Sequence, residues 1–392
     1  MKNRPPDNAK ISISALRFFS GSAIKRFYIL TKAFTFVIIY KYVYAQFYRK
    51  GQQMKEKLGF GIIGCGAAAE VHVKALKELT SDATICGVCD INPEAAKKFA
   101  EKNGVFAYSS AEELLADENV DVVNICTPSG FHYLSVVAAA RAKKHIICEK
   151  PLAINKAQLD EIEKECALSG VTVAVISQYR CFDDVLFAKK AIEDGKLGKI
   201  VCADIYMKYY RSQEYYDSGS WRGTKAIDGG GALMNQGIHG LDLLLFLAGN
   251  VKKVYALSKT LVRNIEVEDT LSAVCEFENG ATGVIQATTS VFPGYPRRLE
   301  INGDKGSIAI EESTLTRFET EKGDILKSEH LSGVSPAANF THVGHKKQIA
   351  DTIEAIRTGR EPISNLKDGR RAVDLILAIY ESAETGKPVE IR

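Results

Sequence analysis

The sequence predicts an α/β plus α+β protein, in which a doubly wound parallel sheet is followed by an α/β domain built on a large open, mainly antiparallel sheet. Two patterns lead to this prediction. Short apolar runs alternate with helical patterns over residues 58–180, and longer β-rich runs joined by short turns follow them. A chain of 392 residues that is 46% hydrophobic can bury the cores of more than one domain.

The first 53 residues differ in charge from the rest of the chain. They hold ten of the 51 Lys and Arg and one of the 48 Asp and Glu, so they carry +9, while the remaining 41 basic and 47 acidic residues carry −6. The globular part therefore gives no electrostatic reason to expect nucleic-acid binding.

The leader, residues 1–53, has an apolar run over residues 33–40 that is too short to span a bilayer. We expect Met54 to be the true start or the leader to be a disordered extension, and no stable membrane association of the globular part. A secretory signal cleaved after residue 45 is the alternative.

The nine cysteines are an odd number and lie in apolar runs. This is typical of reduced, buried thiols rather than of a disulfide framework, so we expect a cytoplasmic protein. Cys86 and Cys89 form a C-x-x-C, but they lie three residues apart in an expected strand and therefore on opposite faces. Neither redox nor zinc chemistry is favoured there.

Residues 58–76 are expected to form a strand, a glycine turn and a helix. The turn has the pattern G-x-G-x-x-A, with Gly64, Gly66 and Ala69 at its fixed positions. Gly64 permits the tight turn, Gly66 lets the backbone approach a pyrophosphate, and Ala69 lets the helix pack closely on the sheet. The next apolar run ends at Asp90, where a carboxylate binds ribose hydroxyls and repels a 2′-phosphate. The pattern predicts NAD rather than NADP; the alternative is that Asp90 only caps the following helix.

The alternation continues through residue 180. Helices are expected over residues 91–104, 109–120, 132–144 and 155–170, and strands over 121–128, 145–151 and 171–180. Because ligands of such sheets gather at the carboxyl ends of the strands, we predict that the residues at these ends contact the cofactor. They are Thr127, Pro128, Glu149, Lys150 and Gln178.

The second half begins with a helical stretch over residues 182–198. Its β-rich runs are 199–211, 251–262, 269–277, 281–291, 297–304 and 306–312. Turns as short as residues 278–280 exclude parallel crossovers, so this sheet is expected to be antiparallel. In the first run both alternating faces are largely apolar, with Ile200, Cys202 and Tyr206 against Val201, Ala203, Ile205 and Met207. A sheet that is apolar on both faces needs a second cover, so we expect a homodimer or homotetramer formed through the open sheet.

Taken together, these motifs resemble the Gfo/Idh/MocA oxidoreductase family. The resemblance also rests on GGGALMNQGIHGLDLL at residues 229–244 and on the ending at 372–391, and it covers residues 54–392. It implies an NAD-binding Rossmann domain over 54–178 and a substrate-binding and oligomerisation domain over 179–392. The C-terminal helix is expected to pack back towards the Rossmann domain.

The resemblance also implies a catalytic set. Lys150 corresponds to the family's active-site lysine and is expected to stabilise alkoxide charge on the reacting oxygen. His239 lies four residues after Asn235, so a helix would place both side chains on one face. There the Asn235 amide would position the carbinol and His239 would remove its proton. Many members carry Asp at the position of Asn235, and an amide cannot take up a proton, which would leave His239 as the sole base.

Five aromatic and basic residues are candidates for binding substrate, because rings stack on sugars and arginines bind carboxylates or phosphates. They are Tyr179, Arg180, Tyr209, Trp221 and Arg222, in addition to Asn235 and His239. Their alternative role is packing. No metal site is predicted, because the spacing of His239 and Asp242 is not a zinc pattern.

The expected function is an NAD-dependent dehydrogenase that moves a hydride between a secondary hydroxyl and the nicotinamide. The substrate class is a sugar, sugar acid, nucleotide sugar or cyclitol. The stretch 221–239 looks most like the branch that oxidises nucleotide-linked N-acetylhexosaminuronates at C3. Two alternatives remain: an NAD-dependent glycosidase that uses transient oxidation, and a non-catalytic regulator that binds NAD or sugar.

Overall fold

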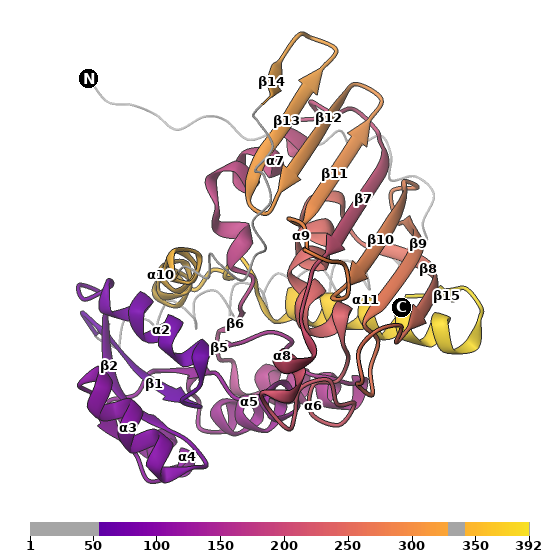
Figure 1. Cartoon of the computed structure of the whole chain (residues 1–392). Coiled ribbons are helices and arrows are strands. Elements are labelled where there is room, and N and C mark those ends of the chain that lie inside the picture. Colours follow the sequence, from indigo (N-terminus) through magenta and orange to yellow (C-terminus); the bar gives the residue numbers. More distant parts are fainter. Residues whose placement is uncertain (1–54, 328–341, 392) are drawn as a thin grey trace, which may run out of the picture. The chain divides into compact units, whose positions relative to one another are not determined.

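The computed structural model describes residues 55–327 and 342–391, so the expectations for residues 1–53 lie outside the described residues. The first sheet has six parallel strands in the order β3-β2-β1-β4-β5-β6 (Figure 1). Its strand order reverses between β1 and β4, which is where doubly wound sheets bind ligands. The strands are β1 (Leu58–Ile63), β2 (Ala83–Cys89), β3 (Phe106–Ala107), β4 (Val122–Ile125), β5 (His145–Cys148) and β6 (Val173–Val175).

Five helices alternate with these strands, as expected. They are α2 (Ala67–Lys77), α3 (Pro93–Asn103), α4 (Ala111–Ala116), α5 (His132–Arg141) and α6 (Lys156–Ser169). The Asn92 side chain caps α3 and that of Asn155 caps α6, which satisfies backbone amides that have no partner inside the helix. Helix α2 instead has Gly66 as its N-cap residue and no side-chain cap, so its first amides remain available to a ligand.

The second sheet has nine strands in the order β14-β13-β12-β11-β7-β10-β9-β8-β15. Only the central pair β7–β10 is parallel, so the prediction of a mainly antiparallel sheet is confirmed. The strands are β7 (Ile200–Lys208), β8 (Val251–Lys259), β9 (Thr270–Phe277), β10 (Thr282–Thr288), β11 (Arg298–Gly303), β12 (Gly306–Glu311), β13 (Thr314–Thr320), β14 (Ile325–Lys327) and β15 (Val389–Glu390).

Helices cover one face of the second sheet. Helix α9 (Ile238–Ala248) packs on β7 and β11, α11 (Leu366–Thr385) packs on β8, and α7 (Asp183–Glu193) packs on β13. On this face Ala203, Ile205 and Met207 are fully buried. Figure 1 shows the strands of this sheet side by side, with α9 and α11 next to them.

The opposite face of the second sheet is only partly apolar. It exposes Tyr255, Leu257 and Val274, but β7 places Asp204 and Lys208 beside Cys202 and Tyr206 on the same side. The outer face of β7 is therefore less apolar than its inner face, because charged side chains lie among its apolar ones.

Two helices near the C-terminus contact the first sheet. Helix α10 (Val343–Thr358) packs against α2, and α11 contacts β6 and α6 as well as the second sheet. Ion pairs join α10 to the first half, since Lys346 lies 2.8 Å from Glu78 and Arg357 pairs with Asp82.

Two stretches differ locally from the sequence prediction. The strand expected over residues 171–180 ends at Val175, and Gln178–Cys181 form a 3-10 turn. Residues Ala232–Gly237 form a π-helical turn before α9 begins at Ile238. Asn235 therefore lies in the π-turn, which has more residues per turn than an α-helix, and His239 lies in the first turn of α9.

Among the described residues, the structure contains no helix that combines the length and the apolar character needed to cross a membrane.

Candidate active site

The glycine turn has the shape that a dinucleotide pyrophosphate needs. Gly64 has φ +95°, and a Cβ there would lie 2.7 Å from the Cys126 carbonyl oxygen, so no larger residue fits. A Cβ on Gly66 would meet nothing within 4 Å, which leaves open space at the uncapped start of α2. Ala69 is fully buried in the core of the first sheet. The three residues therefore occupy the places that their spacing predicts.

Asp90 is tied to the glycine turn. Its carboxylate accepts a 2.8 Å hydrogen bond from the Cys65 amide and a 2.9 Å bond from the Asn92 amide. Because Asn92 caps α3, Asp90 is not needed for that purpose. Ile91, the next residue, is fully exposed and offers an apolar surface beside this carboxylate.

The ends of β4 and β6 carry polar atoms without a partner. The buried Thr127 Oγ1 and Gln178 Oε1 have no hydrogen bond in the structure, and buried polar groups normally have one. His132 joins the two proline motifs, since its ring nitrogens lie 2.7 Å from the Thr127 carbonyl oxygen and 2.6 Å from that of Pro151. The unpartnered oxygens and the open glycine turn fit a bound dinucleotide.

Lys150 connects the two sheets. It follows β5, and its Nζ donates a 2.7 Å hydrogen bond to the backbone oxygen of Asn235 in the π-turn. Burial lowers the pKa of Lys150, while the nearby charges of Glu149 and Asp228 raise it. The ammonium is therefore held at the carboxyl edge of the parallel sheet, facing the second domain.

His239 lies on α9 beside Lys150, and both line one small cavity together with Ser177. The His239 ring meets the Tyr179 ring edge-on with centroids 5.4 Å apart, and the Arg297 guanidinium lies 4.1 Å from the centre of the Tyr179 ring. Burial, and then the positive charges of Lys150 and Arg297, hold the pKa of His239 well below its usual range. The imidazole is thus neutral near pH 7 and able to accept a proton.

The loop before the glycines brings an aromatic and basic cluster to the same π-turn. The Arg222 guanidinium stacks on both Trp221 and Tyr215, at 4.5 Å from each ring centre. The Tyr215 hydroxyl contacts Arg222 Nη1 at 2.7 Å and Gln236 Nε2 at 2.9 Å. Arg211 Nη2 also donates to Gln236, at 2.9 Å. Trp221 and Arg222 are therefore linked through side chains to the residue next to Asn235.

Known proteins match this architecture over most of the chain. Residues 58–177 match the model of an oxidoreductase family with an NAD-binding Rossmann fold, and residues 185–309 match the Gfo/Idh/MocA C-terminal domain. The WlbA dehydrogenase of Bordetella pertussis, solved with NADH and UDP-GlcNAcA, is 32% identical, with a TM-score of 0.77 over 86% of this chain and 99% of that chain. The chain belongs to the Gfo/Idh/MocA family.

Two other relatives are named for other substrates. Myo-inositol 2-dehydrogenase of Thermotoga maritima is 29% identical over 341 residues, which are 84% of this chain and 98% of that protein. Levoglucosan dehydrogenase, solved with NADH and levoglucosan, is 26% identical with a TM-score of 0.77 and covers 86% of this chain and 99% of that one. This Gfo/Idh/MocA chain is accordingly an NAD-binding oxidoreductase, and the resemblance inferred from its motifs is confirmed.

Two predicted substrate residues have other places in this family member. Arg180 is 1% exposed; it binds both carboxylate oxygens of Asp242, at 2.8 and 2.6 Å, and its Nη1 lies 3.1 Å from Asp368. Its guanidinium joins α9 to α11, and a substrate contact of Arg180 stays a prediction. Tyr209 is 5% exposed, and burial raises its pKa, so it packs inside the second domain.

Asn235 makes hydrogen bonds that its spacing alone did not predict. Its side-chain amide donates to Asp228 and accepts a 2.9 Å bond from Gln236, while its backbone oxygen binds Lys150. Asp228, missed by the sequence reasoning, is 2% exposed, and burial raises its pKa although the bonds from Gly223 and Asn235 lower it. Its position directly before the three glycines was the available signal.

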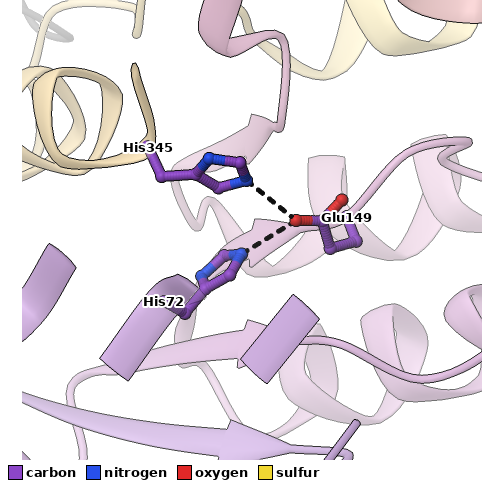
Figure 2. A group of neighbouring side chains, drawn as sticks. All are labelled: His72, Glu149 and His345. Carbon is purple, nitrogen blue, oxygen red and sulfur yellow. Dashed lines mark hydrogen bonds and ion pairs between the residues drawn. The ribbon is translucent and has the colours of Figure 1, made fainter. Parts of the chain in front are cut away.

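A second missed group surrounds Glu149. His72 and His345 both contact one oxygen of this carboxylate, as Figure 2 shows. Glu149 was predicted to contact the cofactor, and the structure places it behind Lys150 between two histidines. Since His345 lies 196 residues from Glu149 in the chain, no local pattern could have brought the two together.

Proposed function

We propose that this protein oxidises a secondary hydroxyl of a sugar-like substrate, with Lys150 and His239 as its catalytic residues. The observation that carries this proposal is their meeting in one cavity where the π-turn reaches the carboxyl edge of the parallel sheet. Bound NAD would supply the acceptor for the hydride of the carbinol carbon. Gly64, Gly66 and Asp90 would hold its pyrophosphate and ribose, and Thr127 and Gln178 offer it unpartnered oxygens.

The two side chains divide the remaining chemistry. The neutral His239 imidazole takes up the hydroxyl proton as the C–H bond breaks, because its lowered pKa keeps it unprotonated. The Lys150 ammonium stabilises the negative charge that grows on the oxygen. Asn235 orients the lysine through its backbone carbonyl rather than binding the carbinol through its amide.

We further propose a nucleotide-linked N-acetylhexosaminuronate as the substrate, oxidised at C3. The similarity to the WlbA dehydrogenase complex supports this choice. So does the cluster of Arg211, Trp221 and Arg222, because two guanidinium groups beside aromatic rings suit a carboxylate or phosphate next to a sugar.

Oligomerisation and compartment complete the proposal. The face of the second sheet that exposes Tyr255, Leu257 and Val274 suits a homodimer or homotetramer, because apolar patches of this kind mark interfaces. The nine cysteines are free, and burial raises the pKa of the Cys65 thiol to about 12. Unpaired thiols of this kind fit a reducing, cytoplasmic compartment.

The test uses purified protein with NAD and follows NADH formation against inositols, aldoses, sugar acids and nucleotide-linked hexosaminuronates. Lys150→Ala and His239→Ala are each expected to lower kcat roughly 10²–10⁴-fold, while Lys156→Ala, an exposed lysine at the start of α6, leaves it unchanged. Binding of NAD without reduction by any substrate would contradict the proposal. Release of phenol from an aryl glycoside without net NADH would favour the glycosidase instead.

A further inference from the structure

A buried cluster of His72, Glu149 and His345 lies directly behind the proposed catalytic lysine. The three residues are 0%, 8% and 2% exposed. His72 lies on α2, Glu149 follows β5, and His345 lies on α10 near the end of the chain. Figure 2 shows both imidazole rings directed at the same carboxylate oxygen.

The hydrogen bonds define which atoms carry protons. The Asn124 amide nitrogen, which can only donate, lies 2.9 Å from His72 Nδ1. His72 therefore accepts at Nδ1 and carries its proton on Nε2, which donates to Glu149 Oε1 at 3.0 Å. His345 Nε2 donates to the same oxygen at 3.2 Å. Burial opposes ionisation of Glu149, but these two bonds hold its pKa well below the usual range, as expected for a carboxylate with several donors.

Glu149 interacts with Lys150 in two ways, through a backbone hydrogen bond and through its charge. The Lys150 amide donates to Glu149 Oε2 at 3.3 Å. The charges that act on the Lys150 ammonium are those of Glu149 and Asp228, which favour its protonated form, and of Arg222 and Arg211, which oppose it. Lys150 in turn lowers the pKa values of His132 and His239. Burial lowers the pKa of Lys150 overall, and among the nearby charges Glu149 opposes this shift most.

We propose that His72 and His345 are positioning residues: they hold the Glu149 carboxylate ionised and oriented behind Lys150, and this charge keeps the lysine an ammonium during turnover. The inference deepens the proposed function and rests on the role that it gives to Lys150. His345 lies on α10 and reaches Glu149 because α10 packs against α2. The protonated state of Lys150 therefore depends on this packing.

The same three donors are of the types that bind divalent transition metals, and their ligand atoms all lie within 4.8 Å of one another. The hydrogen bonds favour direct contact between the histidines and Glu149 over a metal ion between them. Nε2 of His72 must be deprotonated to bind a metal, whereas the Asn124 contact places its proton there. A metal also adds positive charge beside the Lys150 ammonium. Metal binding is accordingly an outcome that would overturn the proposal.

The decisive experiment measures the titration of Lys150 without any substrate. Trace labelling with acetic anhydride at a series of pH values, followed by mass spectrometry of the Lys150 peptide, gives the midpoint of ammonium deprotonation. Glu149→Gln is expected to lower this midpoint by about one pH unit or more. His345→Leu is expected to lower it by a smaller amount, and His345→Gln, which keeps a donor, to restore it partly.

The matched control is His342→Ala, which removes the histidine at the start of the same helix that pairs with Glu78 outside the cluster. It should leave the Lys150 midpoint unchanged. Where substrate is known, the alkaline limb of kcat should move in the same direction as the labelling midpoint in each variant, with little change in the KM for NAD.

Three results would refute the proposal. One is a Lys150 midpoint in folded Glu149→Gln that equals that of wild type. Another is ¹⁵N shifts of the wild-type protein that place the His72 proton on Nδ1, a measurement that needs no variant to fold. The third is a stoichiometric metal that chelation removes together with a change in those shifts. Absence of dehydrogenase activity in wild type, by contrast, would contradict the proposed function and leave the labelling result standing.

Discussion

Replacing Arg180 with Met tests whether this arginine is structural. The guanidinium is 1% exposed and binds both oxygens of Asp242, which is itself 3% exposed. Asp368 keeps a second partner in Arg371, at 3.0 Å, so the main effect of Arg180→Met is to leave the Asp242 carboxylate buried without its partner. Breaking a buried pair in this way costs about 3–5 kcal/mol, and for a chain of this size the Tm should fall by roughly 5 °C.

Thermal unfolding together with kinetics distinguishes the two roles of Arg180. A structural arginine changes Tm while the KM of the remaining folded enzyme stays close to that of wild type. The double variant Arg180→Met/Asp242→Leu should regain much of the lost stability, because an apolar pair of similar volume removes the uncompensated charge. An unchanged Tm with a tenfold or larger rise in substrate KM would show that Arg180 binds substrate and that the assignment from the structure is wrong.

Three further predictions concern the cofactor turn, the base and the open sheet. Asp90→Ser should weaken NAD binding roughly 10–100-fold, because charge-assisted hydrogen bonds are lost, and should improve binding of NADP. Quenching of the fluorescence of the single tryptophan, Trp221, measures the binding of both cofactors. An unchanged preference for NAD would contradict the role of Asp90. Burial and neighbouring cations lower the pKa of His239, so this base becomes protonated only at a pH below the ordinary pKa of histidine. We therefore expect kcat/KM to stay level as the pH falls through 6.5. An acid limb centred at or above pH 6.5 would refute this expectation. Val274→Asp on the outer sheet face should convert the proposed oligomer to monomers in light scattering, and a monomeric wild type would remove the reason for the experiment.

Several features of this protein follow from short stretches of sequence. The parallel sheet, the glycine turn, the place of Asp90 and the loop at Glu149-Lys150-Pro151 all depend on neighbours within one strand–turn–helix unit. In such a unit the backbone conformation that glycine and alanine permit decides the geometry. The antiparallel second sheet was predictable for the same reason, because its short turns leave no room for crossovers.

Other features were decided only when distant segments packed together. Arg180 is of a residue type that often binds substrate, but its guanidinium pairs with Asp242 and Asp368 from two other helices. The π-turn at residues 232–237 turned the Asn235 side chain towards Asp228 and its carbonyl towards Lys150.

The sequence by itself determined the family and the glycine turn, and it led to the prediction of Lys150 and His239 as catalytic residues, since each depends on residue types at fixed local spacing. Tertiary structure alone decided that His72 and His345 meet at Glu149, 77 and 196 residues away along the chain. The physical reason is that a buried charge must find its donors wherever the fold supplies them, and pairing over such separations leaves no periodic pattern in the sequence.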